Sequence, residues 1–191
     1  MLQIINLSPL MILESLNQLS CNLSNYLTKS YDLIDEITIL QSMTDLNNST
    51  YLNKVVVSLI NIERETAAGL HFHSSASHSY HKQGTPSWQL NLYVLIAAVF
   101  SEKQYEESLR LISGVCYFLQ TNPIFKTSNE RQIAIEPVNL SLQELSNLWN
   151  ILGGKYYPSI LCKMRVLTLD ALEIKNFTGS VQQKNMTHDS L

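Results

Sequence analysis

The chain has 191 residues, a formal net charge of −3 and a charged fraction of 15%. This length fits one domain, and the acidic balance excludes binding of nucleic acid through bulk positive charge. The charged fraction is low against the ~25% usual for globular proteins. Two explanations for it stay open: a surface largely covered by partner proteins, or the Asn-rich composition of a low-GC genome.

The three cysteines, Cys21, Cys116 and Cys162, are widely spaced, odd in number and set among apolar residues. They predict buried thiols in a reducing compartment, and so a cytoplasmic protein. The N-terminal stretch MLQIINLSPLMILESLNQL has no basic n-region and no small-residue cleavage site, and polar residues interrupt its apolar run. We therefore expect neither a signal peptide nor a membrane anchor.

The first predicted element is an amphipathic helix over residues 9–30, which Ser8 can cap and which Pro9 suits at its first position. Its apolar side chains recur at steps of three and four: Leu13, Leu16, Leu19, Leu23, Tyr26 and Leu27. Two strands follow over 34–43 and 54–63, and the turn-forming DLNNST between them favours a hairpin. The second strand carries apolar residues on both faces, which is typical of a strand inside a covered sheet.

Residues 66–86 are polar, small and rich in histidine, and we interpret them as a long flexible loop. The spacing H-x-H-x4-H-x2-H could supply imidazoles to zinc or nickel from His71, His73, His78 and His81. The segment has no cysteine, no acidic partner and no rigid element to preset a geometry. We therefore expect a solvated loop and no metal site.

The stretch NLYVLIAAVF at 91–100 has no charge and is too short to span a bilayer. It predicts a central strand over Trp88–Val99. Ser101 is expected to cap the next helix, which runs to about Gln120. The predicted apolar side of that helix consists of Tyr105, Leu109, Ile112, Cys116 and Leu119.

The last third of the chain predicts a short strand over 131–136, a helix over 142–152 and a final strand over 160–170. Ser141 and Glu144 form a capping box at the start of this helix, and Gly153-Gly154 ends it.

The order of elements predicts one α+β domain over residues 1–174, followed by a polar tail over 175–191. We expect a mixed, mainly antiparallel sheet of four to five strands with three helices packed on it.

No catalytic motif is present: the sequence has no G-x-S-x-G, no H-E-x-x-H, no Walker loop and no dinucleotide-type glycine pattern. The run Glu63-Arg64-Glu65 lacks a paired histidine or a second carboxylate at a defined spacing, so it is solvated or meets the charges of a neighbour. Lys163 and Arg165 interrupt an apolar alternation, which is costly unless they are paired or exposed. They fit an edge strand, an exposed face or a contact between subunits.

Three stretches carry a family resemblance: NKVVVSLINIERE (53–65), LNLYVLIAAVFSEKQYEESLRLISGVCYFLQTNPIF (90–125) and LSLQELSNLWNILGGKYYPSILCKMRVLTLD (140–170). Together they resemble the small cap, or tube-terminator, proteins of phage-tail-like contractile injection systems of the antifeeding-prophage type. The specific set comprises Asn-Leu-Tyr-Val-Leu at 91–95, Tyr105 with its helix, Leu148-Trp149, and Lys155-Tyr156 followed by Pro158-Ser159. The resemblance covers about residues 8–172.

The resemblance implies a structural protein with a tail-terminator fold, without catalytic residues or cofactor. Such proteins form a sixfold ring on the distal end of the inner tube, stop its polymerisation and join it to the outer sheath. The implied partners are other copies of the chain and the tube and sheath proteins, with no nucleic acid and no membrane insertion.

A closed ring needs complementary patches on opposite flanks. The candidate interface places Glu63 and Glu65 on one flank and Lys163 and Arg165 on the other. Arg64, Lys155 and Tyr156 are further candidates. Tyr156 can instead anchor a connector, as Trp149 can anchor the core. The rival functions are a monomeric adaptor or chaperone that grips a partner with the His-rich loop, and a metal-dependent enzyme.

Overall fold

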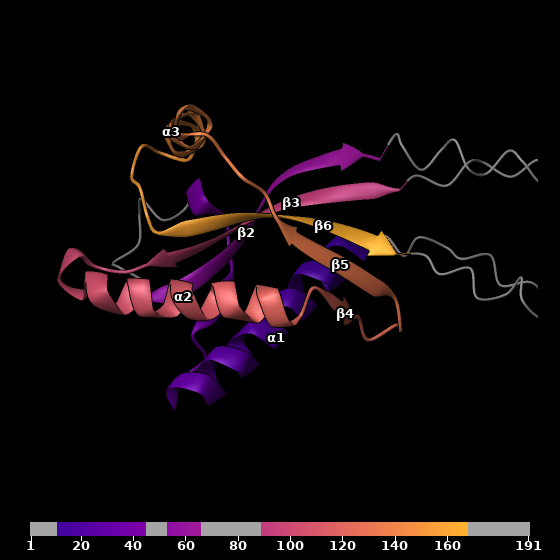
Figure 1. The fold of residues 1–191 in the computed structure, drawn as a ribbon, viewed down its shortest axis with the longest axis horizontal. Coiled ribbons are helices and arrows are strands. Elements are labelled where there is room, and N and C mark those ends of the chain that lie inside the picture. The colour runs from indigo at the N-terminus through magenta and orange to yellow at the C-terminus, as the bar shows by residue number, and fades with distance from the viewer. Residues whose placement is uncertain (1–10, 45–52, 66–88, 168–191) are drawn as a thin grey trace, which may run out of the picture.

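A mixed sheet with the strand order β1-β2-β3-β6-β5-β4 organises the chain (Figure 1). The computed structural model describes residues 11–44, 53–65 and 89–167. Within them the strands are β1 Thr38–Leu40, β2 Lys54–Arg64, β3 Leu90–Val99, β4 Ile124–Lys126, β5 Gln132–Pro137 and β6 Ser159–Leu167. The helices are α1 Met11–Tyr31, α2 Tyr105–Thr121 after a 3-10 turn at Glu102–Gln104, and α3 Leu142–Ile151. The predicted α+β class is confirmed, and the sheet gains β4, a short strand that the sequence did not predict.

The uncharged stretch at 91–100 supplies β3, which lies in the interior of the sheet between β2 and β6 and is antiparallel to both. Its alternate residues are buried on opposite faces, with Leu92 and Val94 on one and Leu95 and Ala97 on the other. A strand buried on both faces needs apolar side chains at nearly every position, which explains the absence of charge.

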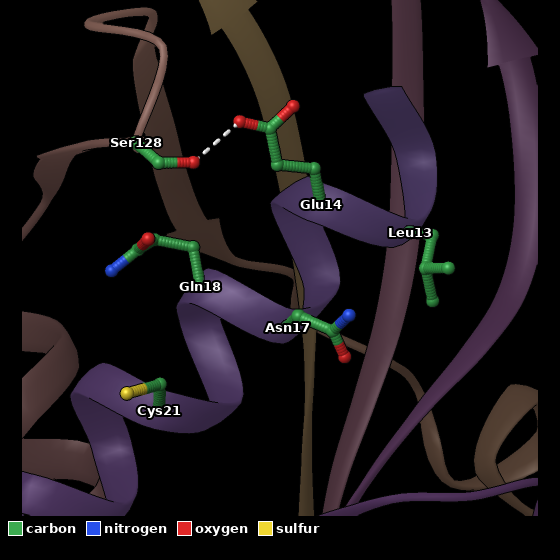
Figure 2. Close-up of a pocket in the computed structure, with 6 residues that line it drawn as sticks. All are labelled: Leu13, Glu14, Asn17, Gln18, Cys21 and Ser128. Atoms are coloured by element: carbon green, nitrogen blue, oxygen red, sulfur yellow. Dashed lines mark hydrogen bonds between the residues drawn. The ribbon is translucent and has the colours of Figure 1, made fainter. Parts of the chain in front are cut away.

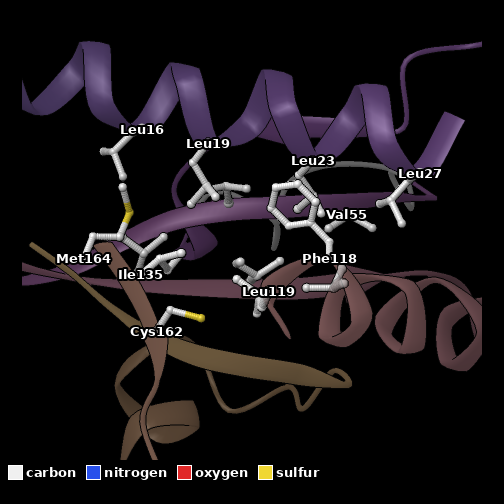
Figure 3. Close-up of a cluster of buried hydrophobic side chains, with 14 of the residues drawn as sticks. Leu16, Leu19, Leu23, Leu27, Val55, Phe118, Leu119, Ile135, Cys162 and Met164 are labelled. Atoms are coloured by element: carbon white, nitrogen blue, oxygen red, sulfur yellow. The ribbon is translucent and has the colours of Figure 1, made fainter. Parts of the chain in front are cut away.

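Helices α1 and α2 cover one face of the sheet (Figure 3). The α1 side chains that point into this core are Leu16, Leu19, Leu23 and Leu27. Tyr26 packs on Phe118 of α2 with their ring centroids 5.5 Å apart. Where the helices cross, Gly114 lets α2 approach α1, because an added Cβ would lie 2.7 Å from Tyr31 Cε2 and 2.8 Å from Leu27 Cδ2.

Helix α3 lies over part of the opposite face and is anchored by Trp149, its only fully buried residue among those described. Trp149 packs in a second core with Leu95, Ala97 and Tyr157. The predicted capping box is confirmed at Ser141 and Glu144. The predicted glycine end of the helix is confirmed too, since Gly153 and Gly154 have φ angles of 110° and 78°, which favour glycine.

The predicted hairpin between the first two strands is wrong. β1 is shorter than the predicted 34–43 and runs parallel to β2, with the Val55 amide donating to the Ile37 carbonyl at 2.8 Å and the Gln41 amide to the Val57 carbonyl at 3.1 Å. Parallel strands need a crossover of a dozen or more residues. The chain between Leu40 and Lys54 is long enough, and its Met43 is buried in the second core on the α3 side.

The predicted apolar side of α2 is also only partly right. The buried residues are Ser108, Leu111, Gly114, Val115, Phe118 and Leu119. Tyr105, Leu109 and Cys116 face outward, as does Leu13 on α1. Ser101 makes no side-chain cap and instead donates to Gln104 Oε1 at 3.2 Å.

Of the three cysteines, only Cys162 is buried as predicted, and burial raises the pKa of its thiol to about 12. Cys21 and Cys116 are exposed because they lie on the outer sides of their helices. The predicted helix start at Ser8 and Pro9, the loop 66–86 with its histidines, and the tail 175–191 lie outside the described residues.

Candidate assembly surface

Helix α3 covers only part of its sheet face, around Val56 of β2, the C-terminal half of β3 and Leu161 of β6, and no other described element covers the rest (Figure 1). The uncovered part is polar. We call it the polar face, and its residues are Asn61, Glu63, Asn91, Tyr93, Glu136, Lys163 and Arg165. It extends across the four interior strands of the sheet, which lie side by side in the order β2, β3, β6 and β5.

Strand register fixes this arrangement. Asn91 of β3 is the partner of Glu63 on β2 and of Arg165 on β6. Lys163 is the partner of Tyr93 on one side and of Glu136 on the other. Directly opposed residues point to the same face of a sheet, so these side chains share one surface.

A bulge in β2 brings Glu63 to the polar face. Val55, Val57 and Leu59 point into the core beneath α1 and α2, and strict alternation would send Glu63 there as well. The register shifts by one residue between Leu59 and Asn61. An extra residue reverses every side chain beyond it, so Asn61 and Glu63 turn to the opposite face.

The polar side chains bind one another. Asn91 is 4% exposed, and its Nδ2 donates to Glu65 Oε2 at 3.0 Å. The Tyr93 hydroxyl hydrogen-bonds the Glu63 carboxylate. This bond, followed by burial and by the charges of Glu63, Glu65 and Glu136, raises the pKa of Tyr93. On the other side, Arg165 Nη2 lies 3.3 Å from Glu136 Oε1.

Two buried atoms of the polar face, Asn91 Oδ1 and Arg165 Nε, have no hydrogen-bond partner among the described residues. Lys163 likewise has no ion pair within the described part of the chain. The polar face therefore has a donor, an acceptor and a cation left for a partner, although most of its charged side chains already bind another residue of the chain.

The predicted interface residues fall into two groups. Glu63, Glu65, Lys163 and Arg165 come together around Asn91, and Arg64 ends β2 beside them. The expectation that the acids and the cations lie on opposite flanks is wrong, because β2 and β6 both pair with β3. The edge-strand alternative for Lys163 and Arg165 is wrong too, since β6 is an interior strand.

Lys155 and Tyr156 lie apart from the polar face, just after the glycine end of α3. Tyr156 packs edge-on against Trp149 with ring centroids 5.7 Å apart, and Lys155 Nζ lies 5.3 Å from the ring centroid of Tyr157. Tyr156 is nevertheless exposed. It thus serves as a connector anchor while still offering its outer side to solvent.

The outer side of α1 carries a shallow groove of about 360 Å³ (Figure 2). It is lined by Leu13, Glu14, Asn17, Gln18, Cys21 and Ser128. Glu14 is held by the turn between β4 and β5, accepting from Ser128 Oγ at 2.8 Å and Asn129 Nδ2 at 2.7 Å. These hydrogen bonds hold α1 against the turn. The residues that line the groove do not form a catalytic constellation.

Residues 16–183 match the family model described as the Pvc16 N-terminal domain. The chain belongs to this family. The resemblance to tube terminators seen in the sequence is thereby confirmed for nearly the whole chain.

Two solved structures have the fold of this Pvc16 N-terminal domain, each with a TM-score of 0.51. One is the sheath/tube terminator of the PVC extracellular contractile injection system in its extended state, 14% identical over 94% of this chain and 65% of that chain. The other is the tube-terminating cap of the anti-feeding prophage, 15% identical over 90% of this chain and 59% of that chain. The chain thus spans about three fifths of the length of these structures. No match was found among curated proteins.

The described residues contain no helix long and apolar enough to cross a membrane. They also contain no group of three or more histidine, cysteine or acidic residues that could hold a metal ion.

Proposed function

We propose that this chain is the terminator of a contractile injection system, a structural protein that caps the inner tube and couples it to the sheath. One observation carries the proposal: the chain matches the Pvc16 N-terminal domain family over residues 16–183. The fold shared with two solved terminators over at least nine tenths of the chain supports it.

In this function the copies form a closed ring, hexameric as the family resemblance implies, on the distal end of the tube. The ring presents one face to the last tube layer and offers no surface that accepts another, so polymerisation ends. The chain acts in the cytoplasm, where the particle assembles.

The polar face suits one of these contacts. Arg165 is paired with Glu136, and Glu63 is hydrogen-bonded by Tyr93, so a partner that covers the face leaves few charges without a counterpart. Lys163, Asn91 Oδ1 and Arg165 Nε supply the remaining donors and acceptor. Polar surfaces of this kind contribute register and specificity more than affinity.

The decisive experiment deletes the gene for this chain and images the particles. The expected result is tubes of uncontrolled length or particles with open tube ends, restored to normal by the wild-type gene. Particles of normal length that lack this polypeptide at their ends contradict the proposal. In the wild type, a chain that stays strictly monomeric and is absent from the particle ends favours the adaptor instead.

A further inference from the structure

The outward side of α2 carries an apolar stripe that no described element covers. Tyr105 and Leu109 are 54% and 41% exposed, Ile112 is half-buried and Cys116 is exposed. These residues follow one another at steps of four, three and four, so they form one ridge along the helix. That spacing is typical of a helix face that packs against another apolar surface.

A second exposed apolar group lies at the end of α3. Ile151 is 78% exposed, and Tyr156 is exposed just beyond the two glycines. Helix α3 packs on one face of the sheet and α2 on the other (Figure 1). The two surfaces therefore cannot meet within one chain.

The charges near the two surfaces are opposite in sign. The start of α2 carries Glu102, Glu106 and Glu107 against Lys103, and Glu107 is already paired with Arg110 at 2.9 Å, which leaves Glu102 and Glu106 at this end. Lys155, beside Tyr156, is the only charged residue between Leu145 and Cys162. An apolar stripe with an acidic end is thus complementary to an apolar group that carries a cation.

We propose that the α2 stripe of one copy receives the α3 end of the next copy, with Tyr156 and Ile151 packed along Leu109 and Cys116. The contact uses two different patches, so repeating it around an axis builds a ring or a helical array. The inference rests on the proposed function, to which it adds the surfaces that join neighbouring copies.

Cysteine cross-linking tests this contact, because Cys116 already lies on the stripe and Cys162 is buried. In a Cys21→Ser background, Ile151→Cys places a thiol at the α3 end. The matched control is Ile34→Cys, since Ile34 is 100% exposed and lies in the connection between α1 and β1. The concentrated chain and the particles that contain it are each treated with a short bismaleimide and separated under denaturing conditions.

The expected result for the Ile151→Cys variant is a ladder of copies linked from Cys116 to the new thiol at position 151. The Ile34→Cys control is expected to give no ladder. A ladder in either preparation supports the contact. No ladder in both, or equal yields from the control, overturns it. So does a product that joins Cys116 to a tube or sheath protein, because another partner then occupies the stripe.

The proposed function is tested separately, by imaging where the chain lies in the particle. A chain imaged at the tube end without the ladder keeps its role as terminator and loses this interface.

Charge reversal gives a second readout. Lys155→Glu is expected to lower the association constant of the copies roughly two- to fivefold, as for an exposed ion pair, and Glu106→Lys in the same chain restores it. Lys29→Glu, on an exposed lysine of α1, serves as the control and leaves association unchanged. Failure of Glu106→Lys to rescue Lys155→Glu contradicts the pairing.

Discussion

Arg165 Nη2 on β6 lies 3.3 Å from Glu136 Oε1 on β5, and the two residues are diagonal neighbours across the strand pair. Both side chains are roughly half exposed, so water screens the pair, and it contributes less than about 1 kcal/mol to folding. An interface charge that is paired within its own chain has to be tested for assembly and for stability separately.

The first prediction concerns this pair. We expect Arg165→Gln and Glu136→Gln each to lower the free energy of unfolding by less than about 1 kcal/mol, with a coupling no larger than that in the double mutant. Urea denaturation measures these values, and Asp35→Asn is an exposed control. If the polar face is an interface, Arg165→Gln weakens assembly while stability stays near wild type. Unaltered assembly argues against the interface.

The second prediction concerns Trp149, which anchors α3. Trp149→Ala removes a buried aromatic side chain and is expected to cost about 3–5 kcal/mol, enough to release α3 from the sheet. Trp149→Phe is the matched control, because it keeps a ring and removes an N–H that has no partner among the described residues, so it should cost under about 1.5 kcal/mol. Amide exchange should quicken in α3 and stay slow in α2. Equal loss of protection in both helices contradicts a local role.

The third prediction concerns the crossing of α1 and α2 at Gly114. The Tyr31 ring has little room to move away from an added methyl group, because its hydroxyl donates to the Arg110 carbonyl at 2.9 Å and the Arg110 guanidinium lies 4.8 Å from its centroid. Gly114→Ala gains up to about 1 kcal/mol of helix propensity but overpacks the crossing by about 1–3 kcal/mol. We expect net destabilisation in urea unfolding, with Ser113→Ala near neutral. A stabilised Gly114→Ala variant shows that the helices separate without cost.

The fourth prediction concerns pH and the start of α3. Hydrogen bonds from the backbone and side chain of Ser141 lower the pKa of Glu144 below its ordinary 4.5. A carboxylate with a lowered folded pKa stabilises the fold fully above its unfolded pKa, and the effect is lost as pH falls through the folded value. Amide protection in α3 should therefore drop in acid below pH 4.5 in the wild type. Glu144→Gln should remove that dependence, while Ser141→Ala removes only part of it, because the backbone amide of residue 141 still donates to Glu144. An unaltered acid profile in Glu144→Gln counts against the capping box as its cause.

The fifth prediction concerns the thiols. At neutral pH Cys21 and Cys116 are expected to react rapidly with a thiol reagent, while Cys162 reacts only after unfolding, because burial raises its pKa to about 12. Mass spectrometry of the labelled peptides identifies the sites. In assembled particles the proposed α2–α3 contact protects Cys116 and leaves Cys21 reactive. Rapid labelling of Cys162 in the native chain contradicts its buried position.

Local patterns in the sequence were enough to predict several elements. The uncharged alternation at 91–100 predicts a two-sided interior strand, and the Ser141–Glu144 spacing with Gly153-Gly154 brackets α3 correctly. These signals are short-range, since capping, glycine φ angles and alternation depend on residues within a turn or a strand. For the same reason the alternation of Lys163 and Arg165 with buried Cys162 and Met164 was predictable.

The candidate site could be predicted only as a set of residues. The sequence marked Lys163 and Arg165 as costly to bury and Glu63 as solvated or facing the charges of a neighbour. Strand order and the bulge before Asn61 decided that these residues share one face. Both features depend on pairings between residues far apart in the chain, which no local pattern encodes.

The sequence by itself determined that α2 is a helix with apolar side chains at helical spacing, and that 91–100 lies inside a sheet. Only the tertiary structure decided which side of α2 is buried. The helix carries two adjacent apolar stripes, and both have helical spacing, so the sequence pattern does not distinguish between them. The close approach at Gly114 and the packing of Phe118 turn one stripe to the core and leave Tyr105 and Leu109 outside. That choice lies in the fit between α1, α2 and the sheet, and it is what leaves an apolar stripe on α2 open to a partner.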